Sequence, residues 1–86
     1  MRLVVKFYVY DLPPGFQDAE FTFDEDGATV NDVLDACLIL FKERGVTMVE
    51  SELRTATVIV GGRWSNPGDR VSDGDSISII RPMDGG

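Results

Sequence analysis

The chain has 86 residues and a formal net charge of −7, with 43% hydrophobic and 27% charged residues. This length corresponds to one domain with a small core, and the composition is that of a globular rather than a disordered chain. The negative charge argues against nucleic acid or an anionic membrane surface as a partner, because phosphates would repel it. No apolar run approaches the roughly 20 residues of a membrane span.

The redox compartment and the cellular location are predicted from two features. A single cysteine, Cys37, cannot form an internal disulfide, so the fold does not depend on an oxidising compartment. The first 14 residues contain a basic residue and an apolar run, but their alternation suits a strand better than a signal peptide. We therefore expect a cytoplasmic protein.

Charge is unevenly distributed along the chain. Between Phe7 and Phe41 there are eight acidic residues and no Lys or Arg, whereas from Lys42 onward six basic residues nearly balance seven acids. Most of these acids are expected on a solvated face that keeps the protein soluble. A docking face for a basic partner protein is the alternative, and both interpretations stay open.

The first quarter of the chain reads as a hairpin with a long loop. Residues 2–10 alternate as a strand, with Leu3 and Val5 on the same face. Residues 11–15 are rich in Pro and Gly and predict a turn. Residues 20–23 alternate again and predict the second strand.

One long helix follows. Thr29 with Asp32 three residues later resembles a capping box, and Gly45 stands where a left-handed C-terminal cap belongs. The apolar residues between them recur at the spacing of a core-facing helix, and they are Val30, Val33, Leu34, Cys37, Leu38 and Phe41. Cys37 is expected to be a buried small hydrophobe rather than a reactive thiol. Ile39 projects away from this stripe, so it should face solvent and remains a candidate contact.

The second half predicts short strands and turns. Residues 46–56 are irregular, a loop or a short helical turn, and residues 57–60 are a β-branched strand. Gly61-Gly62 indicates a tight turn before a short strand at residues 63–64. Residues 76–80 alternate as the last strand.

The last strand has Ile77 and Ile79 facing inward, and Pro82 ends its hydrogen bonding because proline has no N–H. The whole pattern predicts an α+β domain, in which one main helix packs across a mixed sheet of four or five strands.

Catalytic arrangements that need histidine, and zinc-type clusters, are absent from the sequence, whereas a catalytic pair of carboxylates stays open. There is no histidine, so neither a Ser-His-Asp nor a Cys-His arrangement can form, and zinc-type clusters are missing. The acids at positions 24–26 lack the spacing of a calcium loop. A domain of this size has little room for a substrate cleft, so a free-standing enzyme is not expected.

The combination of VSDGD at residues 71–75, one strand, Pro82 and then Gly85-Gly86 resembles the C-terminal half of the ubiquitin-like β-grasp sulfur carriers. That family includes MoaD, the small subunit of molybdopterin synthase, and the thiamine-pathway carrier ThiS. The segment ATVNDVLDACLILF is similar to the start of the family's helix. The resemblance spans essentially the whole chain and is greatest to MoaD. It implies a β-grasp domain at residues 1–81 and a flexible Gly-Gly tail at residues 82–86.

The resemblance also implies a carrier cycle centred on the carboxylate of Gly86. A ubiquitin-activating-type enzyme uses ATP to adenylate this carboxylate, and sulfur then replaces one oxygen to give a thiocarboxylate. Gly85 and Gly86 lack a Cβ and can thread a narrow channel in that enzyme. The second partner is a sulfur-accepting synthase subunit, MoaE-like or thiazole synthase-like. No bound cofactor or metal is implied for the carrier itself, and no nucleic acid or membrane is expected as a partner.

Partner contacts are expected along the last strand and the tail, at Ile79, Arg81, Pro82, Met83 and Asp84. Two of these residues depart from the family pattern. Arg81 stands where proline is frequent, and Asp84 places a negative charge two residues before the reactive carboxylate. A partner that binds this tail should therefore offer a basic group near Asp84.

Three interpretations of function follow. The leading one is a sulfur carrier for molybdopterin biosynthesis, with a ThiS-like carrier for the thiazole of thiamine as its variant. The second is a ubiquitin-like modifier that joins its C-terminus to lysines of other proteins. The third is a β-grasp interaction module in which Gly85 and Gly86 have no function.

Overall fold

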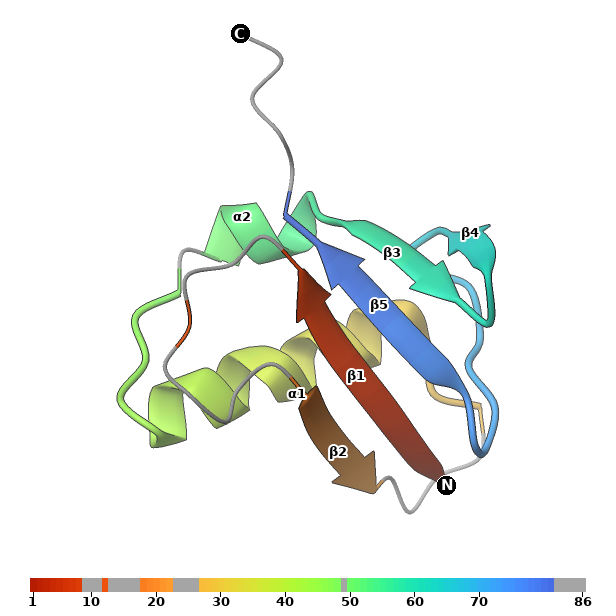
Figure 1. Cartoon of the computed structure of the whole chain (residues 1–86), viewed down its shortest axis with the longest axis horizontal. Coiled ribbons are helices and arrows are strands. Elements are labelled where there is room, and N and C mark those ends of the chain that lie inside the picture. The colour runs from red at the N-terminus through yellow and green to blue at the C-terminus, as the bar shows by residue number, and fades with distance from the viewer. Residues whose placement is uncertain (9–11, 13–17, 23–26, 49, 82–86) are drawn as a thin grey trace, which may run out of the picture.

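The computed structural model describes residues 1–8, 12, 18–22, 27–48 and 50–81. Figure 1 shows one twisted sheet with α1 lying across one of its faces and α2 beside the end of β5. The elements in chain order are β1 (Arg2–Tyr8), β2 (Asp18–Thr22), α1 (Val30–Glu43), α2 (Glu50–Arg54), β3 (Thr57–Val60), β4 (Arg63–Ser65) and β5 (Ser76–Ile80).

The sheet is mixed and five-stranded, in the order β2-β1-β5-β3-β4. β1 pairs in parallel with β5 and antiparallel with β2, while β3 lies antiparallel to both β4 and β5. The first and last strands of the chain are therefore neighbours in the middle of the sheet (Figure 1). The α+β prediction, with one main helix packed across a mixed sheet, is confirmed.

The core lies between α1 and the inner face of the sheet. Along β1 the side chains alternate strictly between exposed and buried, which is the pattern of a strand covered on one face. The Phe7 ring of β1 meets the Phe41 ring of α1 with centroids 5.2 Å apart and planes tilted by 56°. The remaining buried positions of this core are contributed mainly by the helix stripe and by alternate residues of β3 and β5, namely Val30, Val33, Leu34, Cys37, Val58, Ile77 and Ile79.

Both ends of α1 are capped as the sequence predicts. The Thr29 hydroxyl accepts from the Asp32 N–H, and the Asp32 carboxylate accepts from the Thr29 N–H at 2.9 Å, which is a complete capping box. At the other end, Gly45 adopts φ 69° and the Val46 N–H donates to the Phe41 carbonyl at 2.8 Å. With the Gly45 N–H donating to the Lys42 carbonyl, this is a Schellman motif.

The turn between Ser72 and Asp75 directly precedes β5 and is hydrogen-bonded to the start of β1. The Asp73 carboxylate accepts from the Arg2 N–H at 2.7 Å, and the Asp75 carboxylate accepts from the Ser72 N–H at 2.7 Å. Gly74 has φ 84°, and its N–H donates to the Arg2 carbonyl at 2.8 Å. Each residue of the Asp-Gly-Asp sequence thus makes a contact that fixes where the parallel pair of β1 and β5 begins.

Some predicted boundaries differ from the structure. β2 begins at Asp18, two residues before the predicted start, because the register with β1 continues to the Lys6 pair. The irregular segment at residues 46–56 contains the short helix α2, whose Leu53 is fully buried. The predicted end of the first strand at Tyr10, the end of the second at Phe23 and, apart from Leu12, the predicted turn at residues 11–15 lie outside the described residues.

Candidate functional site

The last described residue before the predicted tail is Arg81, and it has two attachments to the domain. Its N–H donates to the Tyr8 carbonyl at 3.1 Å, which extends the pairing of β5 with β1 by one bond. Its guanidinium forms an ion pair with the Glu52 carboxylate of α2 at 3.2 Å. The predicted tail residues Pro82, Met83, Asp84, Gly85 and Gly86 lie outside the described residues, so their roles remain predictions.

Ile79 does not have the predicted role. Its side chain is 0% exposed and belongs to the core, opposite Phe7 on β1 and Val58 on β3. The prediction of a partner contact by this side chain is therefore wrong, and the reason is the strict alternation of β5. The neighbouring Ile80 points to the opposite face and is the half-buried apolar residue of this strand there, on the same face as Ser76 and Ser78.

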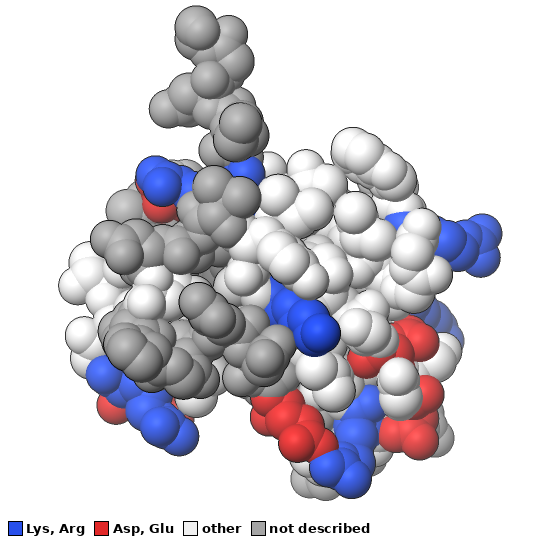
Figure 2. All heavy atoms as spheres, viewed as in Figure 1, with Lys and Arg blue, Asp and Glu red and all other residues white. Residues whose placement is uncertain are grey.

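The face of the sheet opposite α1 carries three of the large hydrophobic side chains that are exposed among the described residues, and we call it the outer face. Trp64 is 81% exposed on the edge strand β4, and Tyr8 and Val4 are exposed on β1, with β5 and β3 between the two strands. Its members follow from strand register, and they are Val4, Lys6, Tyr8, Thr57, Ile59, Trp64, Ser76, Ser78 and Ile80. Figure 2 shows this face as largely uncharged over β3 and β5.

Charge is confined mainly to the margins of this face in Figure 2. At the edge formed by β1 and β2, Arg2 and Glu20 form an exposed ion pair. Lys6, whose side chain is exposed, is paired in register with the uncharged Ser78 of β5 on one side and with Asp18 of β2 on the other. An apolar patch with a polar border is the usual anatomy of a protein–protein contact.

Trp64 was not predicted as a functional residue, although the sequence contains a usable signal. Gly61 and Gly62 have φ values of 58° and 81°, which define a two-residue hairpin turn between Val60 and Arg63. Counting outward from that turn pairs Trp64 with Ile59, on the face opposite the buried Val58. An indole on that face of an edge strand has few neighbours to cover it.

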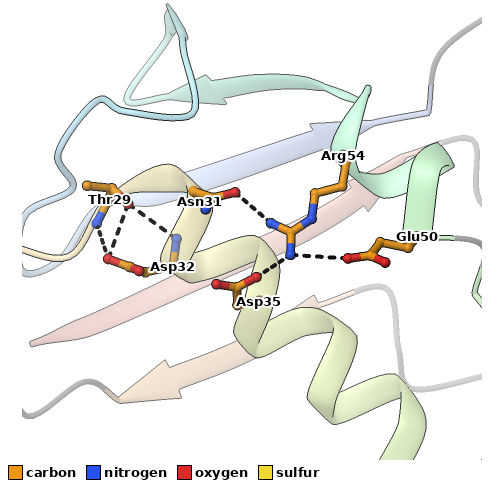
Figure 3. A network of polar contacts seen from close by, with 6 residues as sticks. All are labelled: Thr29, Asn31, Asp32, Asp35, Glu50 and Arg54. Carbon is orange, nitrogen blue, oxygen red and sulfur yellow. Dashed lines mark hydrogen bonds and ion pairs between the residues drawn. The ribbon is translucent and has the colours of Figure 1, made fainter.

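The short helix α2 is tied to α1 by Arg54. Figure 3 shows this side chain reaching from α2 between two residues of α1. It donates to the Asn31 side-chain carbonyl at 2.6 Å and forms an ion pair with Asp35, while Glu50 lies 3.5 Å away on the same helix. The hydrogen bond that Arg54 donates to the Asp35 carboxylate raises the pKa of Arg54 above its ordinary value. α2 is thereby fixed against the first half of α1.

Cys37 is buried, as predicted, and its surroundings do not activate it. Burial raises the pKa of this thiol to about 12, so the thiolate that would act as a nucleophile is scarce at neutral pH. Within the described ranges, no three His, Cys, Asp or Glu residues are grouped so that they could hold a metal ion. None of the helices in the described part of the chain has the length and apolar character needed to cross a membrane.

A shallow cavity of about 530 Å³ lies beside Trp64, next to the β3–β4 turn. Arg63 and Arg70 line it, but so do the carboxylates of Asp69 and Asp75. These carboxylates already accept backbone hydrogen bonds, Asp69 from Asn66 and Asp75 from Ser72. The cavity is therefore mixed in charge, and its acids have structural roles in turns.

The structure is similar over its full length to solved β-grasp proteins. The crystal structure of SAMP1 from Haloferax volcanii, also described as small archaeal modifier protein 1, is 27% identical, with a TM-score of 0.70 and 100% coverage of both chains. The subunit 1 of molybdopterin converting factor from Pyrococcus furiosus is 20% identical, with a TM-score of 0.71, and the match covers 95% of this chain and 98% of that one.

A third structure contains a bound partner. In the complex of subunits 1 and 2 of molybdopterin-converting factor from Helicobacter pylori, the match is 20% identical, with a TM-score of 0.58 and 100% coverage of both chains. Comparisons with protein-family models and with curated protein sequences gave no match. The fold implied by the resemblance in the sequence is thus confirmed, and the chain is a β-grasp protein similar to SAMP1 and to molybdopterin converting factor subunit 1.

Proposed function

We propose that this protein is a carrier whose Gly86 carboxylate is adenylated and then converted to a thiocarboxylate that donates sulfur. The observation that carries the proposal is the end-to-end likeness to SAMP1 and to molybdopterin converting factor subunit 1. The root of the predicted tail at Arg81 also lies at the end of β5, directly beside the Tyr8 and Ile80 end of the outer face. In this proposal the protein presents one reactive atom to its partners and does not itself catalyse a step.

The chemistry explains why a partner must accept the tail. A carboxylate is a poor electrophile, so its oxygen first attacks the α-phosphorus of ATP, and pyrophosphate leaves to give an acyl adenylate. A sulfide-level nucleophile then attacks the carbonyl carbon, AMP leaves with the bridging oxygen, and a thiocarboxylate remains. The reactive carbon must reach the nucleotide pocket of the activating enzyme. Two glycines at positions 85 and 86 place the least steric bulk next to that carbon.

We assign the outer face to docking of the activating enzyme. A large aromatic side chain such as Trp64, exposed among apolar neighbours, is the type of residue that contributes most to binding when it is covered. Docking there would place the enzyme next to Arg81, from which the tail continues. The enzyme would then bind the domain and the tail as one continuous surface.

For the pathway, we propose molybdopterin biosynthesis with a MoaE-like synthase subunit as the sulfur acceptor. Support comes from the similarity to the Pyrococcus furiosus and Helicobacter pylori subunits, the second of which is in complex with subunit 2 of its converting factor. A ThiS-like role in thiazole synthesis is the variant, since the tail chemistry is the same. The identity of the sulfur acceptor separates the two.

A second candidate is a ubiquitin-like modifier joined to lysines of other proteins. It is favoured by the similarity to SAMP1, described as a small archaeal modifier protein. The same acyl adenylate serves this reaction, but the carbonyl carbon is finally attacked by a lysine amine, with formation of an isopeptide bond. Carrier and modifier therefore differ only after activation.

The proposal is tested by mixing the purified chain with the cognate ubiquitin-activating-type enzyme and ATP. We expect pyrophosphate release and, with sulfide present, a thiocarboxylate at Gly86 detected by mass spectrometry. Deletion of Gly86, or addition of one residue after it, should abolish pyrophosphate release and leave the melting temperature nearly unchanged. Wild-type protein that releases no pyrophosphate with its enzyme would show that the proposed function is wrong.

A further inference from the structure

The side chains of three successive residues of α2 contact three different parts of the molecule. The Leu53 side chain is fully buried in the core, Arg54 reaches α1, and Glu52 reaches Arg81. These directions follow from the 100° rotation between neighbouring residues of a helix. A five-residue helix thus connects the core, the main helix and the residue from which the tail continues.

Leu53 and Arg54 fix the position of α2 relative to the core and to α1. Leu53 is 0% exposed, so α2 cannot shift without opening the core. The Arg54 guanidinium adds two contacts to α1, the hydrogen bond to Asn31 at 2.6 Å and the ion pair to Asp35. The backbone of Glu52 therefore has a fixed place relative to the sheet, and from that place its carboxylate reaches the Arg81 guanidinium.

Arg81 is held by two different kinds of contact, a backbone hydrogen bond to β1 and a side-chain ion pair to α2. Its backbone N–H is bonded to the Tyr8 carbonyl at 3.1 Å in the sheet, and its guanidinium meets Glu52 at 3.2 Å on α2. One attachment alone would leave the residue free to turn about the end of β5. Two attachments on separate elements restrict both the position and the orientation of this residue, and so restrict where residue 82 can begin.

We propose that Glu52 is a positioning residue for the tail: through its ion pair with Arg81 it sets the direction in which residues 82–86 leave the domain. The inference rests on the proposed function, because the benefit of a set direction is insertion of the tail into the activating enzyme. The pair is 44% exposed at Arg81 and 38% at Glu52. An exposed pair contributes little to folding stability, so its effect should be found in tail presentation rather than in the melting temperature.

The test compares wild type with Glu52→Gln and Arg81→Gln in pyrophosphate release by the cognate activating enzyme with ATP. Each variant should raise KM for the carrier about two- to fivefold, with kcat unchanged, because the lost order must be recovered during binding and not during chemistry. The matched control is Glu50→Gln, which removes the same charge from the same helix but not the contact with Arg81. Its KM should equal that of wild type.

Two further readouts separate positioning from other roles. In the free protein, nuclear magnetic relaxation should give a lower order parameter for the Arg81 Nε–H in Glu52→Gln than in wild type and in Glu50→Gln. Arg81→Glu alone should raise KM. The charge-exchanged double variant, Glu52→Arg with Arg81→Glu, should reverse most of this increase in KM, because the ion pair is restored with its charges exchanged.

The outcomes are distinct. A raised KM in Glu52→Gln, with recovery in the exchanged variant, supports the inference. The inference is overturned if KM is unchanged in Glu52→Gln but raised in Arg81→Gln, since Arg81 would then act directly on the partner. It is also overturned if KM of the exchanged double variant stays as high as that of Arg81→Glu. If wild type itself is not adenylated, the proposed function fails. In that case the order parameter of Arg81 still decides whether Glu52 orders this residue.

Discussion

Trp64 of β4 lies directly opposite Ile59 of β3, and both side chains are on the outer face of the sheet. Since the indole is 81% exposed, its removal should cost little folding stability, within about 0.5 kcal/mol. We expect Trp64→Ser to weaken binding of the cognate activating enzyme at least about tenfold, because buried aromatic anchors dominate interfaces. Calorimetric titration of the enzyme with the variant measures this loss.

The matched control for Trp64 is Ile39→Ser, since Ile39 is an apolar residue that is 58% exposed on α1, behind the sheet. It should leave the affinity unchanged. Equal losses at both positions would contradict a docking site on the outer face, and a larger loss at Ile39 would transfer the site to the helix.

Cys37 predicts a specific dependence of stability on alkaline pH. Its pKa is raised from 9.0 to about 12 in the folded protein, so its stabilising contribution is full below pH 9 and is lost as pH rises toward 12. Between pH 8 and 10 the free energy of unfolding of wild type should fall by about 1.4 kcal/mol more than that of Cys37→Ala. Urea denaturation at the two pH values measures this difference. Parallel changes in both proteins would mean that the thiol ionises equally well in the folded state.

The hydrogen bond between the Asp75 carboxylate and the Ser72 N–H should make a measurable contribution to folding stability. The carboxylate accepts this N–H at 2.7 Å, and Asp75→Ala should lower the free energy of unfolding by about 1 kcal/mol. Thermal or urea denaturation gives this value. The control is Glu43→Ala, which removes an exposed acid from the last turn of α1 and should change stability by less than about 0.5 kcal/mol. If the two substitutions have the same effect, the loss reflects net charge and not the turn.

At position 54, arginine and lysine should differ in how well they stabilise the fold. Arg54→Lys keeps the positive charge, but one ammonium cannot reproduce the fork that contacts Asn31 and Asp35 together. We expect a loss of about 1 kcal/mol in the free energy of unfolding, measured by urea denaturation. Arg63→Lys, an exchange at an exposed position of β4, is the control and should be neutral. Equal stability of Arg54→Lys and wild type would show that charge alone holds α2.

Much of the fold could be predicted from the sequence because local signals and the core pattern agree. The Thr29 and Asp32 capping box, the Gly45 cap and the Gly61-Gly62 turn are each short-range features, and each is present in the structure. The alternation that predicted Ile79 inward was also sufficient to exclude its side chain as a contact. By the same period of two, Ile80 and not Ile79 lies on the outer face.

Other features depend on contacts between distant parts of the chain. The ion pair of Arg81 with Glu52 joins residues 29 positions apart, and it needs the placement of α2 beside the end of β5. The exposure of Trp64 depends on β4 being the edge strand of the sheet. Neither the strand order nor the place of α2 has a local signature, so the sequence predicted Arg81 only as a partner contact and did not single out Trp64.

The central claim is that the carboxylate of Gly86 becomes a thiocarboxylate. The most direct measurement is the intact mass of the native-ended protein, purified from its host without reducing or alkylating treatment. The account predicts a fraction of molecules in which one oxygen has been replaced by sulfur, with the change located at Gly86 by fragmentation. If the free protein contains only oxygen at its end while other host proteins carry this chain on their lysines, the carrier function is contradicted and the modifier function is the one supported.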